Sequence, residues 1–137
     1  MAGWNEQVID EFRSNDGRTE RWGDRLVVMH TTGAKTGEPR LNPVMGMPDS
    51  GGWIVVASKG GAPDNPSWYY NLLAHPELDI EARIGGGIQT VRVRARELTG
   101  DERAAAWATM VAVAPGFAAY EHKTERVMPL LRLEPVS

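Results

Sequence analysis

The sequence LDIEARIGGGIQTVRVRAR, residues 78–96, alternates apolar and polar side chains on both sides of three consecutive glycines. Alternation with a period of two is typical of a strand that has one buried and one solvated face. The apolar positions are Leu78, Ile80, Ala82 and Ile84 before the glycines, and Val91, Val93 and Ala95 after them. The segment therefore predicts an antiparallel hairpin with one wet face.

Arginines occupy polar positions of the second strand of this hairpin, at Arg92, Arg94 and Arg96. Asp79 and Glu81 are expected on the polar face of the partner strand, where opposite charges on facing strands attract one another. We therefore expect a solvated ladder of ion pairs. A basic patch is the alternative.

Further strands are expected on both sides of the hairpin, at residues 25–32, 41–47, 53–57 and 128–133. These segments are rich in apolar and β-branched residues, and Gly or Pro turns separate several of them. The segment 53–57, WIVVA, should be buried on both faces. With the hairpin, the count is about six strands.

An amphipathic helix is expected from Asn5 to Phe12, where Val8, Ile9 and Phe12 recur at helical spacing. We expect its apolar face to pack on the domain. A mobile lid or a peripheral contact with a membrane surface is the alternative.

Two later segments carry helix-start signals. Asn65 is a candidate N-cap with Pro66 at the first helical position, and His75 with Pro76 should close that helix. Most of its apolar side chains should pack it onto the sheet. Residues 99–102, TGDE, match a capping box, and the apolar positions that follow are Trp107, Met110, Val111 and Ala114.

The order of these elements lacks the strand–helix–strand rhythm of a parallel sheet. The sequence therefore predicts a single domain, residues 1–137, that is mainly β within the α+β class. A small antiparallel barrel with peripheral helices fits this pattern best.

Composition excludes several classes of function. The chain has no cysteine, which rules out disulfides, thiolate nucleophiles and cysteine-ligated metals. Its three histidines stand far apart in the sequence, so we expect no metal site. A formal net charge of −3 argues against nucleic-acid binding. Without an apolar run of membrane-spanning length or a signal-like N-terminus, we expect a cytoplasmic protein.

The segment TTGAKTGEPR, residues 31–40, joins two expected strands. It lacks the glycine spacing of a nucleotide-triphosphatase loop, and Pro39 prevents an early helix. Lys35 and Arg40 would instead project from one rim, where they can grip phosphate or carboxylate. Taken alone, such cations are also common on solvated surfaces.

Two other segments are candidates for ligand contact. Ser58 and Lys59 precede paired glycines after a buried strand, a place where backbone N–H groups can face an anion or a carbonyl oxygen. An ordinary loop is the alternative, and no nucleophile elbow surrounds Ser58. Asn71 stands among apolar neighbours, so its amide must find polar partners.

Taken together, four segments resemble the deazaflavin-dependent nitroreductase family, which uses coenzyme F420 in a split β-barrel. The segments are TTGAKTGEPR (31–40), VVASKGG (55–61), NPSWYYNL (65–72) and PGFAAYEHKTER (115–126), in the order and at the spacing of that family. The resemblance covers nearly the whole chain. It implies a split antiparallel barrel like those that bind FMN.

The resemblance also implies a set of cofactor-binding residues. Lys35, Thr36 and Arg40 would hold the phosphate and the glutamate tail of F420. The groove would be lined by Asn42, Pro43, Val44 and Met45. The ring system would be seated by Ala57, Ser58, Lys59, Trp68 and Asn71, with Phe117 as a further wall.

The implied activity is hydride transfer from reduced F420 to an electron-poor acceptor such as a quinone, an enone, a lactone or a nitro compound. Ser58 and Tyr120 are the candidate catalytic residues. Nitroimidazole-activating members carry tyrosines at the positions of Ala114 and Phe117, so we expect quinone, enone or lactone reduction here. A non-catalytic F420 carrier and an FMN-binding barrel are the alternatives.

Overall fold

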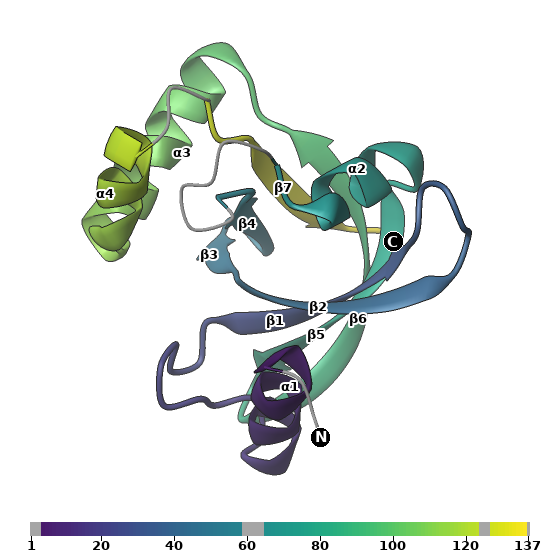
Figure 1. Ribbon diagram of the computed structural model, residues 1–137. Coiled ribbons are helices and arrows are strands. Elements are labelled where there is room, and N and C mark those ends of the chain that lie inside the picture. The colour runs from purple at the N-terminus through teal and green to yellow at the C-terminus, as the bar shows by residue number, and fades with distance from the viewer. Residues whose placement is uncertain (1–3, 59–64, 124–126, 137) are drawn as a thin grey trace.

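The computed structural model describes residues 4–58, 65–123 and 127–136. Four helices and seven strands follow one another along these residues (Figure 1). They are α1 (Trp4–Ser14), β1 (Leu26–Thr32), β2 (Pro39–Met45), β3 (Met47–Asp49), β4 (Gly52–Val56), α2 (Ser67–Ala74), β5 (Glu77–Ile84), β6 (Gly87–Glu97), α3 (Gly100–Val113), α4 (Gly116–Lys123) and β7 (Leu130–Pro135).

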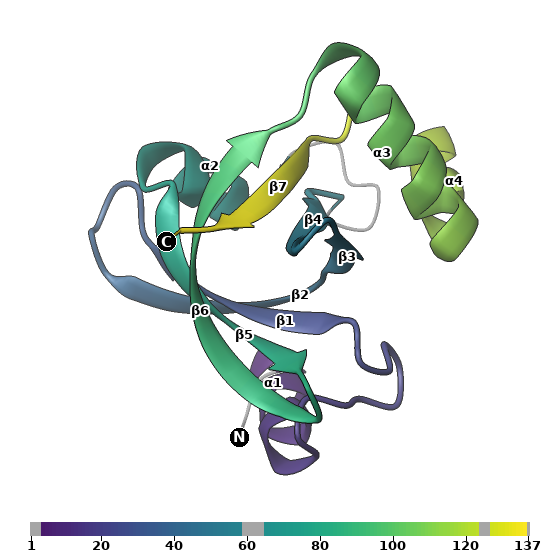
Figure 2. The same cartoon turned by 180° about the vertical axis from the view of Figure 1, so that it is seen from behind.

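The strands form one curled antiparallel sheet in the order β2-β1-β5-β6-β7-β4-β3. Helix α1 lies at one end of the curl, and α3 and α4 lie at the other (Figures 1 and 2). The arrangement confirms the predicted split antiparallel barrel with peripheral helices.

The predicted hairpin is formed by β5 and β6, with Ile80 opposite Val91 and Leu78 opposite Val93. Gly85 and Gly86 make the two-residue turn with φ of 63° and 96°, the left-handed region that this kind of turn requires. Leu78, Ile80 and Val93 are buried in the main core. The alternation of apolar and polar residues therefore predicted both strands correctly.

The segment predicted as one strand at 41–47 is instead two strands, β2 and β3, separated by Gly46. The Gly46 N–H donates to the Arg25 carbonyl oxygen at 2.7 Å. A Cβ on Gly46 would lie 2.9 Å from Val27 Cγ1 and 3.4 Å from Trp53 Cδ1. Because β2 and β3 are the two edges of the sheet, the close approach at Gly46 joins those edges and curls the sheet.

Helix α1 packs on the sheet as predicted, with Val8, Ile9 and Phe12 buried against Leu26 and Val28. The alternatives of a lid or a membrane contact are not needed to explain its apolar face. Phe12 is fully buried, so the helix forms part of the core.

Glu81 departs from the prediction, because it does not offset the hairpin arginines. It is buried, accepts two hydrogen bonds from Arg13 of α1 at 3.0 and 2.6 Å, and lies 2.7 Å from His30 Nε2. The hydrogen bond from Arg13 is the main cause that lowers the pKa of Glu81. Strand β1 is the neighbour of β5 in the sheet, and α1 packs on β1, so both elements reach this carboxylate. The group we name the Glu81 clamp therefore consists of Arg13, His30 and Glu81.

The rest of the ion-pair ladder is present. Arg92 pairs with Asp79 at 3.4 Å, and Arg94 pairs with Glu77 at 3.7 Å. Arg96 instead contacts Glu102 and Glu134 at 2.7 and 2.9 Å. The hairpin arginines are thus neutralised locally, and the basic-patch alternative is wrong.

Helices α2 and α3 begin where the sequence predicted, but their N-caps differ from the prediction. Pro66, with φ of −64° and ψ of 150°, takes the N-cap position that was predicted for Asn65. Thr99 caps α3 without a side-chain hydrogen bond, so the predicted capping box is wrong. Glu102 binds the Arg96 guanidinium instead, and a charge-assisted pair is stronger than a bond to a neutral N–H.

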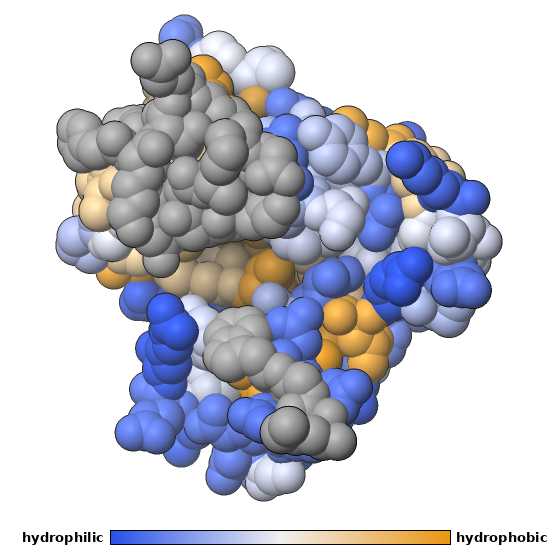
Figure 3. Space-filling view, viewed as in Figure 1, coloured by the Kyte–Doolittle hydropathy of each residue, from blue (hydrophilic) through white to orange (hydrophobic). Residues whose placement is uncertain are grey.

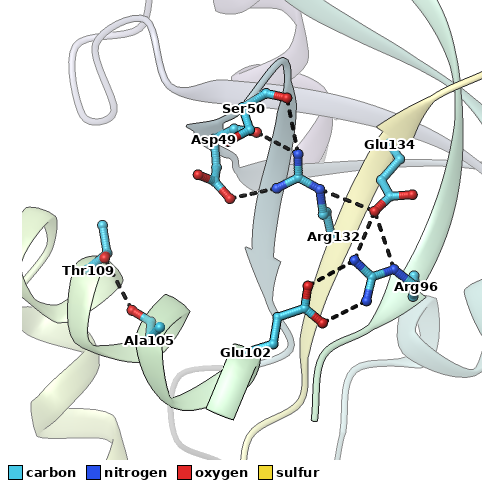
Figure 4. Close-up of polar contacts among 8 residues, drawn as sticks. All are labelled: Asp49, Ser50, Arg96, Glu102, Ala105, Thr109, Arg132 and Glu134. Atoms are coloured by element: carbon cyan, nitrogen blue, oxygen red, sulfur yellow. Dashed lines mark hydrogen bonds and ion pairs between the residues drawn. The ribbon is translucent and has the colours of Figure 1, made fainter. Parts of the chain in front are cut away.

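Figure 4 shows how this pair extends into a network. Glu134 accepts hydrogen bonds from Arg96 and also pairs with Arg132 at 3.2 Å. Arg132 in turn reaches the Asp49 carboxylate at 2.6 Å and the Ser50 carbonyl oxygen at 3.2 Å. The network ties the start of α3 to β6, to β7 and to the β3–β4 turn.

Candidate functional site

The predicted anion grip borders a cavity of about 490 Å³ between the β1–β2 turn and α2. We call it the cation groove. The turn and the helix lie beside each other in Figures 1 and 2. Its lining residues are Gly33, Ala34, Lys35, Thr36, Arg40, Asn42, Ser67, Tyr70 and Asn71. Five of the predicted residues, Lys35, Thr36, Arg40, Asn42 and Asn71, are therefore brought together.

The turn that carries Lys35 is held by its own backbone. Gly33 N–H donates to the Glu38 carbonyl oxygen at 2.8 Å, and Gly37 N–H donates back to Gly33 at 2.9 Å. Gly37 has a φ of 71°, a value that favours glycine. The hydrogen bonds fix the turn between the two strands, so the cations are presented on a defined backbone.

Asn71 fastens this turn to α2. Its Oδ1 accepts a hydrogen bond from the Ala34 N–H at 2.9 Å, and the residue is only 8% exposed. The expectation that this amide must find a polar partner is confirmed. Because the bond crosses from helix to turn, Asn71 sets the width of the groove.

The two cations of the groove are open to solvent. Arg40 has an exposed side chain, and among the described residues its one ion pair is a long contact with Glu38, at 3.8 Å. Lys35 is exposed and has no ion pair with another residue described in the structure. Thr31 Oγ donates to Asn42 Oδ1 at 2.7 Å, which fixes the Asn42 amide beside them. Among the residues that the structure describes, the groove therefore offers positive charge without a strong counter-charge.

A second cavity, of about 300 Å³, lies where β2 ends and α4 begins. We call it the α4 pocket. It is lined by Arg21, Trp22, Arg25, Met45, Val113, Ala114, Gly116 and Phe117. Two predicted residues, Met45 and Phe117, and the small Ala114 thus lie together. Figure 3 shows a hollow with an apolar floor beside the atoms drawn in grey, flanked by hydrophilic residues.

Strand β2 connects the two cavities. Arg40 and Asn42 line the cation groove near its start, and Met45 lines the α4 pocket at its end. At about 3.3 Å per residue, Arg40 and Met45 are separated by roughly 17 Å of extended chain. Pro43 and Val44 are half-buried between them. A long ligand with one anionic and one aromatic end matches this layout.

Other predicted residues lie behind the cavities or outside the described residues. Ala57 is fully buried, and its N–H donates to the Pro129 carbonyl oxygen at 2.9 Å. Trp68 is 8% exposed and packs in the main core. Ser58 is half-buried directly after β4. Lys59 and the side chain of Tyr120 lie outside the described residues.

Sequence reasoning missed several lining residues. Tyr70 is 49% exposed and borders the cation groove with Ser67. The signal was available, since Ser67, Tyr70 and Asn71 recur at helical spacing. Most of the apolar side chains of α2 pack as predicted, namely Trp68, Tyr69 and Leu72, while Leu73 is exposed. The loop that carries Arg21 and Arg25 had no periodic pattern to reveal it.

Tyr69 does pack as expected and anchors α2 to β6. Its hydroxyl donates to Glu97 Oε1 at 2.6 Å. Burial, together with this bond to a carboxylate, raises the pKa of Tyr69 to about 12. The side chain is therefore a neutral structural donor at physiological pH.

The described part of the chain lacks a membrane-spanning helix and a cluster of metal ligands. No helix there is long and apolar enough to cross a membrane. In the same residues, no group of three or more histidine, aspartate or glutamate side chains is arranged to hold a metal ion.

The curled antiparallel sheet, with a cation groove and a pocket of mainly apolar walls joined by one strand, defines a split-barrel protein. The family model for F420H(2)-dependent quinone reductases matches residues 4–135. The chain belongs to this family.

Individual relatives agree with the family match. An F420H(2)-dependent quinone reductase of Mycobacterium tuberculosis is 40% identical over 75 residues, which cover 50% of this chain and 48% of that protein. The chain thus spans about half the length of this relative. A solved F420-H2 dependent reductase is 39% identical, with a TM-score of 0.70 over 80% of this chain and 94% of that one. A structure described as a domain-swapped dimer is 37% identical, with a TM-score of 0.71 over 93% and 92% of the two chains.

Proposed function

We propose that this protein is an F420H2-dependent reductase of quinones. The family membership and the relatives named above support the cofactor and the acceptor class. The observation that carries the proposal is that β2 leads from a groove with two open cations to a pocket with mainly apolar walls. F420 has an anionic tail and a planar ring system, so its tail suits the groove and its ring can lie along β2 beside the pocket that receives the acceptor.

The cation groove would hold the tail. Lys35 and Arg40 would pair with its phosphate and carboxylates, and Thr36 would add a hydroxyl donor. Asn42, Pro43, Val44 and Met45 would line the path of the cofactor along β2. These side chains bind and orient, and charged contacts of this kind contribute about 1.5–3 kcal/mol each.

The ring would be seated where β2 approaches the end of β4. We assign this role to Ala57, Ser58, Lys59, Trp68 and Asn71. Since Ala57 and Trp68 are buried, they would support the ring from behind, while Asn71 would act through the turn that it holds. Reduced F420, when bound, supplies the two electrons and two hydrogens that convert a quinone to a quinol.

The acceptor would lie in the α4 pocket against Phe117, in the space left by the small Ala114. Ser58 is proposed to polarise the acceptor oxygen, and Tyr120 to contact the acceptor from α4. Absence of a tyrosine hydroxyl at residues 114 and 117 favours quinones, enones or lactones over nitroimidazoles. We further propose a cytoplasmic location, which suits a chain without cysteines.

The first test is a parallel fluorescence titration of the purified protein with oxidised F420 and with FMN at matched ionic strength. We expect tight binding of F420 and weak binding of FMN. Preference for FMN, or binding of neither, would contradict the cofactor assignment.

A second measurement separates an enzyme from a carrier. Oxidation of F420H2 is followed by absorbance with a naphthoquinone present and absent. Quinone-dependent turnover supports the reductase. Tight F420 binding without turnover of any quinone, enone or lactone would leave the carrier as the better description.

A further inference from the structure

The α4 pocket contains two cations that the proposed cofactor grip does not use. Arg21 and Arg25 line it together with Trp22, while its other side chains are those of Met45, Val113, Ala114 and Phe117. No carboxylate is among the described residues that line this pocket. Two exposed arginines therefore border a small space whose other walls are mainly apolar.

A tight loop holds these arginines in place. Thr19 and Gly23 exchange two backbone hydrogen bonds, at 2.7 and 2.8 Å, and the Trp22 N–H donates to Thr19 Oγ at 3.1 Å. Thr19 is only 6% exposed, so the base of the loop is anchored. The Arg25 carbonyl oxygen accepts from Gly46 N–H, next to Met45. The backbone of the loop is thus hydrogen-bonded at both ends, so a ligand has to order the two arginine side chains but not the backbone that carries them.

The charges of Arg21 and Arg25 are not neutralised by described residues. Six other arginines, Arg13, Arg40, Arg92, Arg94, Arg96 and Arg132, each pair with a carboxylate within 4 Å. Across the described ranges, no such pair includes Arg21 or Arg25. The Arg21 guanidinium lies 4.9 Å from the centroid of the Trp22 ring, a contact that orients the group and leaves its charge in place.

We propose that the α4 pocket selects acceptors that carry an anionic substituent, such as a carboxylate or a sulfonate, on an apolar aromatic or quinone body. Arg21 and Arg25 bind the anion, and Phe117 and Met45 contact the ring. Guanidinium groups suit this role because their planar donors match the oxygens of such anions. A volume of about 300 Å³ suits a body of one or two rings. This inference rests on the proposed function, in which the molecule that occupies the pocket is an electron acceptor.

The test compares two quinones of similar size, neutral 2-methyl-1,4-naphthoquinone and anionic 1,4-naphthoquinone-2-sulfonate. Each is titrated into the full chain without F420, and binding is followed by quenching of tryptophan fluorescence, with Trp22→Phe assigning the signal to the pocket. We expect the sulfonate to bind about tenfold more tightly, an advantage that falls with added salt. The same ratio should appear in KM when F420H2 is present.

Variants separate specific contact from general charge. The double variant R21Q/R25Q should lose the preference for the sulfonate, while its affinity for the neutral quinone should stay within twofold of the wild-type value. Arg21→Lys with Arg25→Lys should keep part of the preference. Arg94→Gln removes one positive charge from the exposed hairpin and should leave the affinity for both quinones unchanged. Thermal unfolding checks that each variant is folded.

Equal binding of both quinones to the wild type, or a preference that survives in R21Q/R25Q, would overturn the inference. Loss of F420 affinity in R21Q/R25Q, with K35A/R40A unaffected, would also overturn it by assigning the arginines to the cofactor. Turnover without charge preference would reject this inference alone. Preferential binding of the sulfonate without any turnover would reject the proposed function alone.

Discussion

The cation groove and the α4 pocket lie toward opposite ends of β2, and their linings differ. Cations, hydroxyls and amides line the groove, and a hydrogen-bonded turn fastened by Asn71 forms one wall. Ends of helices and apolar side chains form most of the pocket, with Arg21 and Arg25 as its charged groups. One strand thus presents unlike chemistry at its two ends. A ligand that lies along it is therefore expected to bind in one orientation.

The largest expected effect comes from removing the charge at the groove end. The double variant K35A/R40A should raise the dissociation constant of F420 about hundredfold, and each single variant about tenfold, because each contact joins a cation to an anion. The effect should shrink at high salt. Fluorescence titration at two ionic strengths measures it.

The control for this experiment is R94A, which removes a cation from the hairpin and should bind F420 as the wild type does. Affinity for a neutral quinone should be unchanged in K35A/R40A, since the pocket is a separate cavity. A double variant that binds F420 normally would contradict the proposed grip.

The next effect concerns the bend that joins the two edges of the sheet. Gly46→Ala should lower the free energy of unfolding by about 2 kcal/mol, because strain follows from adding a methyl group to a packed core. The methyl would lie 2.9 Å from Val27 Cγ1, and Val27 is buried. Urea denaturation gives the value.

Gly87→Ala is the matched control for that variant, since nothing lies within 4 Å of the added Cβ. It should leave stability unchanged or slightly higher. If Gly46→Ala is as stable as the wild type, the contact with Val27 does not require glycine there. In that case the curl has another cause.

A smaller effect is expected from the bond that holds the groove open. Asn71→Ala removes the acceptor of the Ala34 N–H and should weaken F420 binding about fivefold, equivalent to about 1 kcal/mol. Asn15→Ala, on an exposed side chain that bonds only the Glu11 carbonyl oxygen among described residues, is the control. Binding that is unaltered in N71A would show that the turn keeps its shape without this amide.

The smallest effect belongs to the Glu81 clamp, which lies in neither cavity. Arg13 lowers the pKa of Glu81 in the folded protein, so the clamp stabilises the fold above the unfolded glutamate pKa of about 4.3. That stability is lost as the pH falls through the lower, folded pKa. R13A should therefore cost under about 1 kcal/mol at pH 7 and still less at pH 3.

Unfolding of wild type and R13A is compared at both pH values. F420 affinity serves as the internal control, because it should be equal in the two proteins at pH 7. A difference in stability that stays constant between the two pH values would show that Arg13 acts through packing and not through its ion pair.

The hairpin could be predicted from sequence because its alternation repeats over many residues and its glycine turn has a local cause. Helix α1 could be predicted because its apolar residues recur at helical spacing, which is also a local pattern. The break at Gly46 could not, because it depends on Val27 and Trp53, which approach only when the sheet curls. Glu81 was misplaced since an ion pair with α1 replaced the one expected within the hairpin.

The candidate site could be predicted only in part. Asn71 was found because an amide among apolar residues needs a partner, and Lys35 and Arg40 because their turn joins two strands and places both cations at one rim. The resemblance then gave them a common ligand. Arg21 and Arg25 could not be found, because their role depends on a loop that has no periodic pattern and meets α4 only in three dimensions.

The edge strands also carry a safeguard against aggregation. β2 contains Pro39 and Pro43, and the three-residue β3 contains Pro48. Proline has no N–H to offer a neighbouring chain, and a very short strand offers few groups of any kind. The exposed sides of these edge strands are thus poor templates for strand pairing between molecules, which lowers the tendency of the chain to aggregate at high concentration.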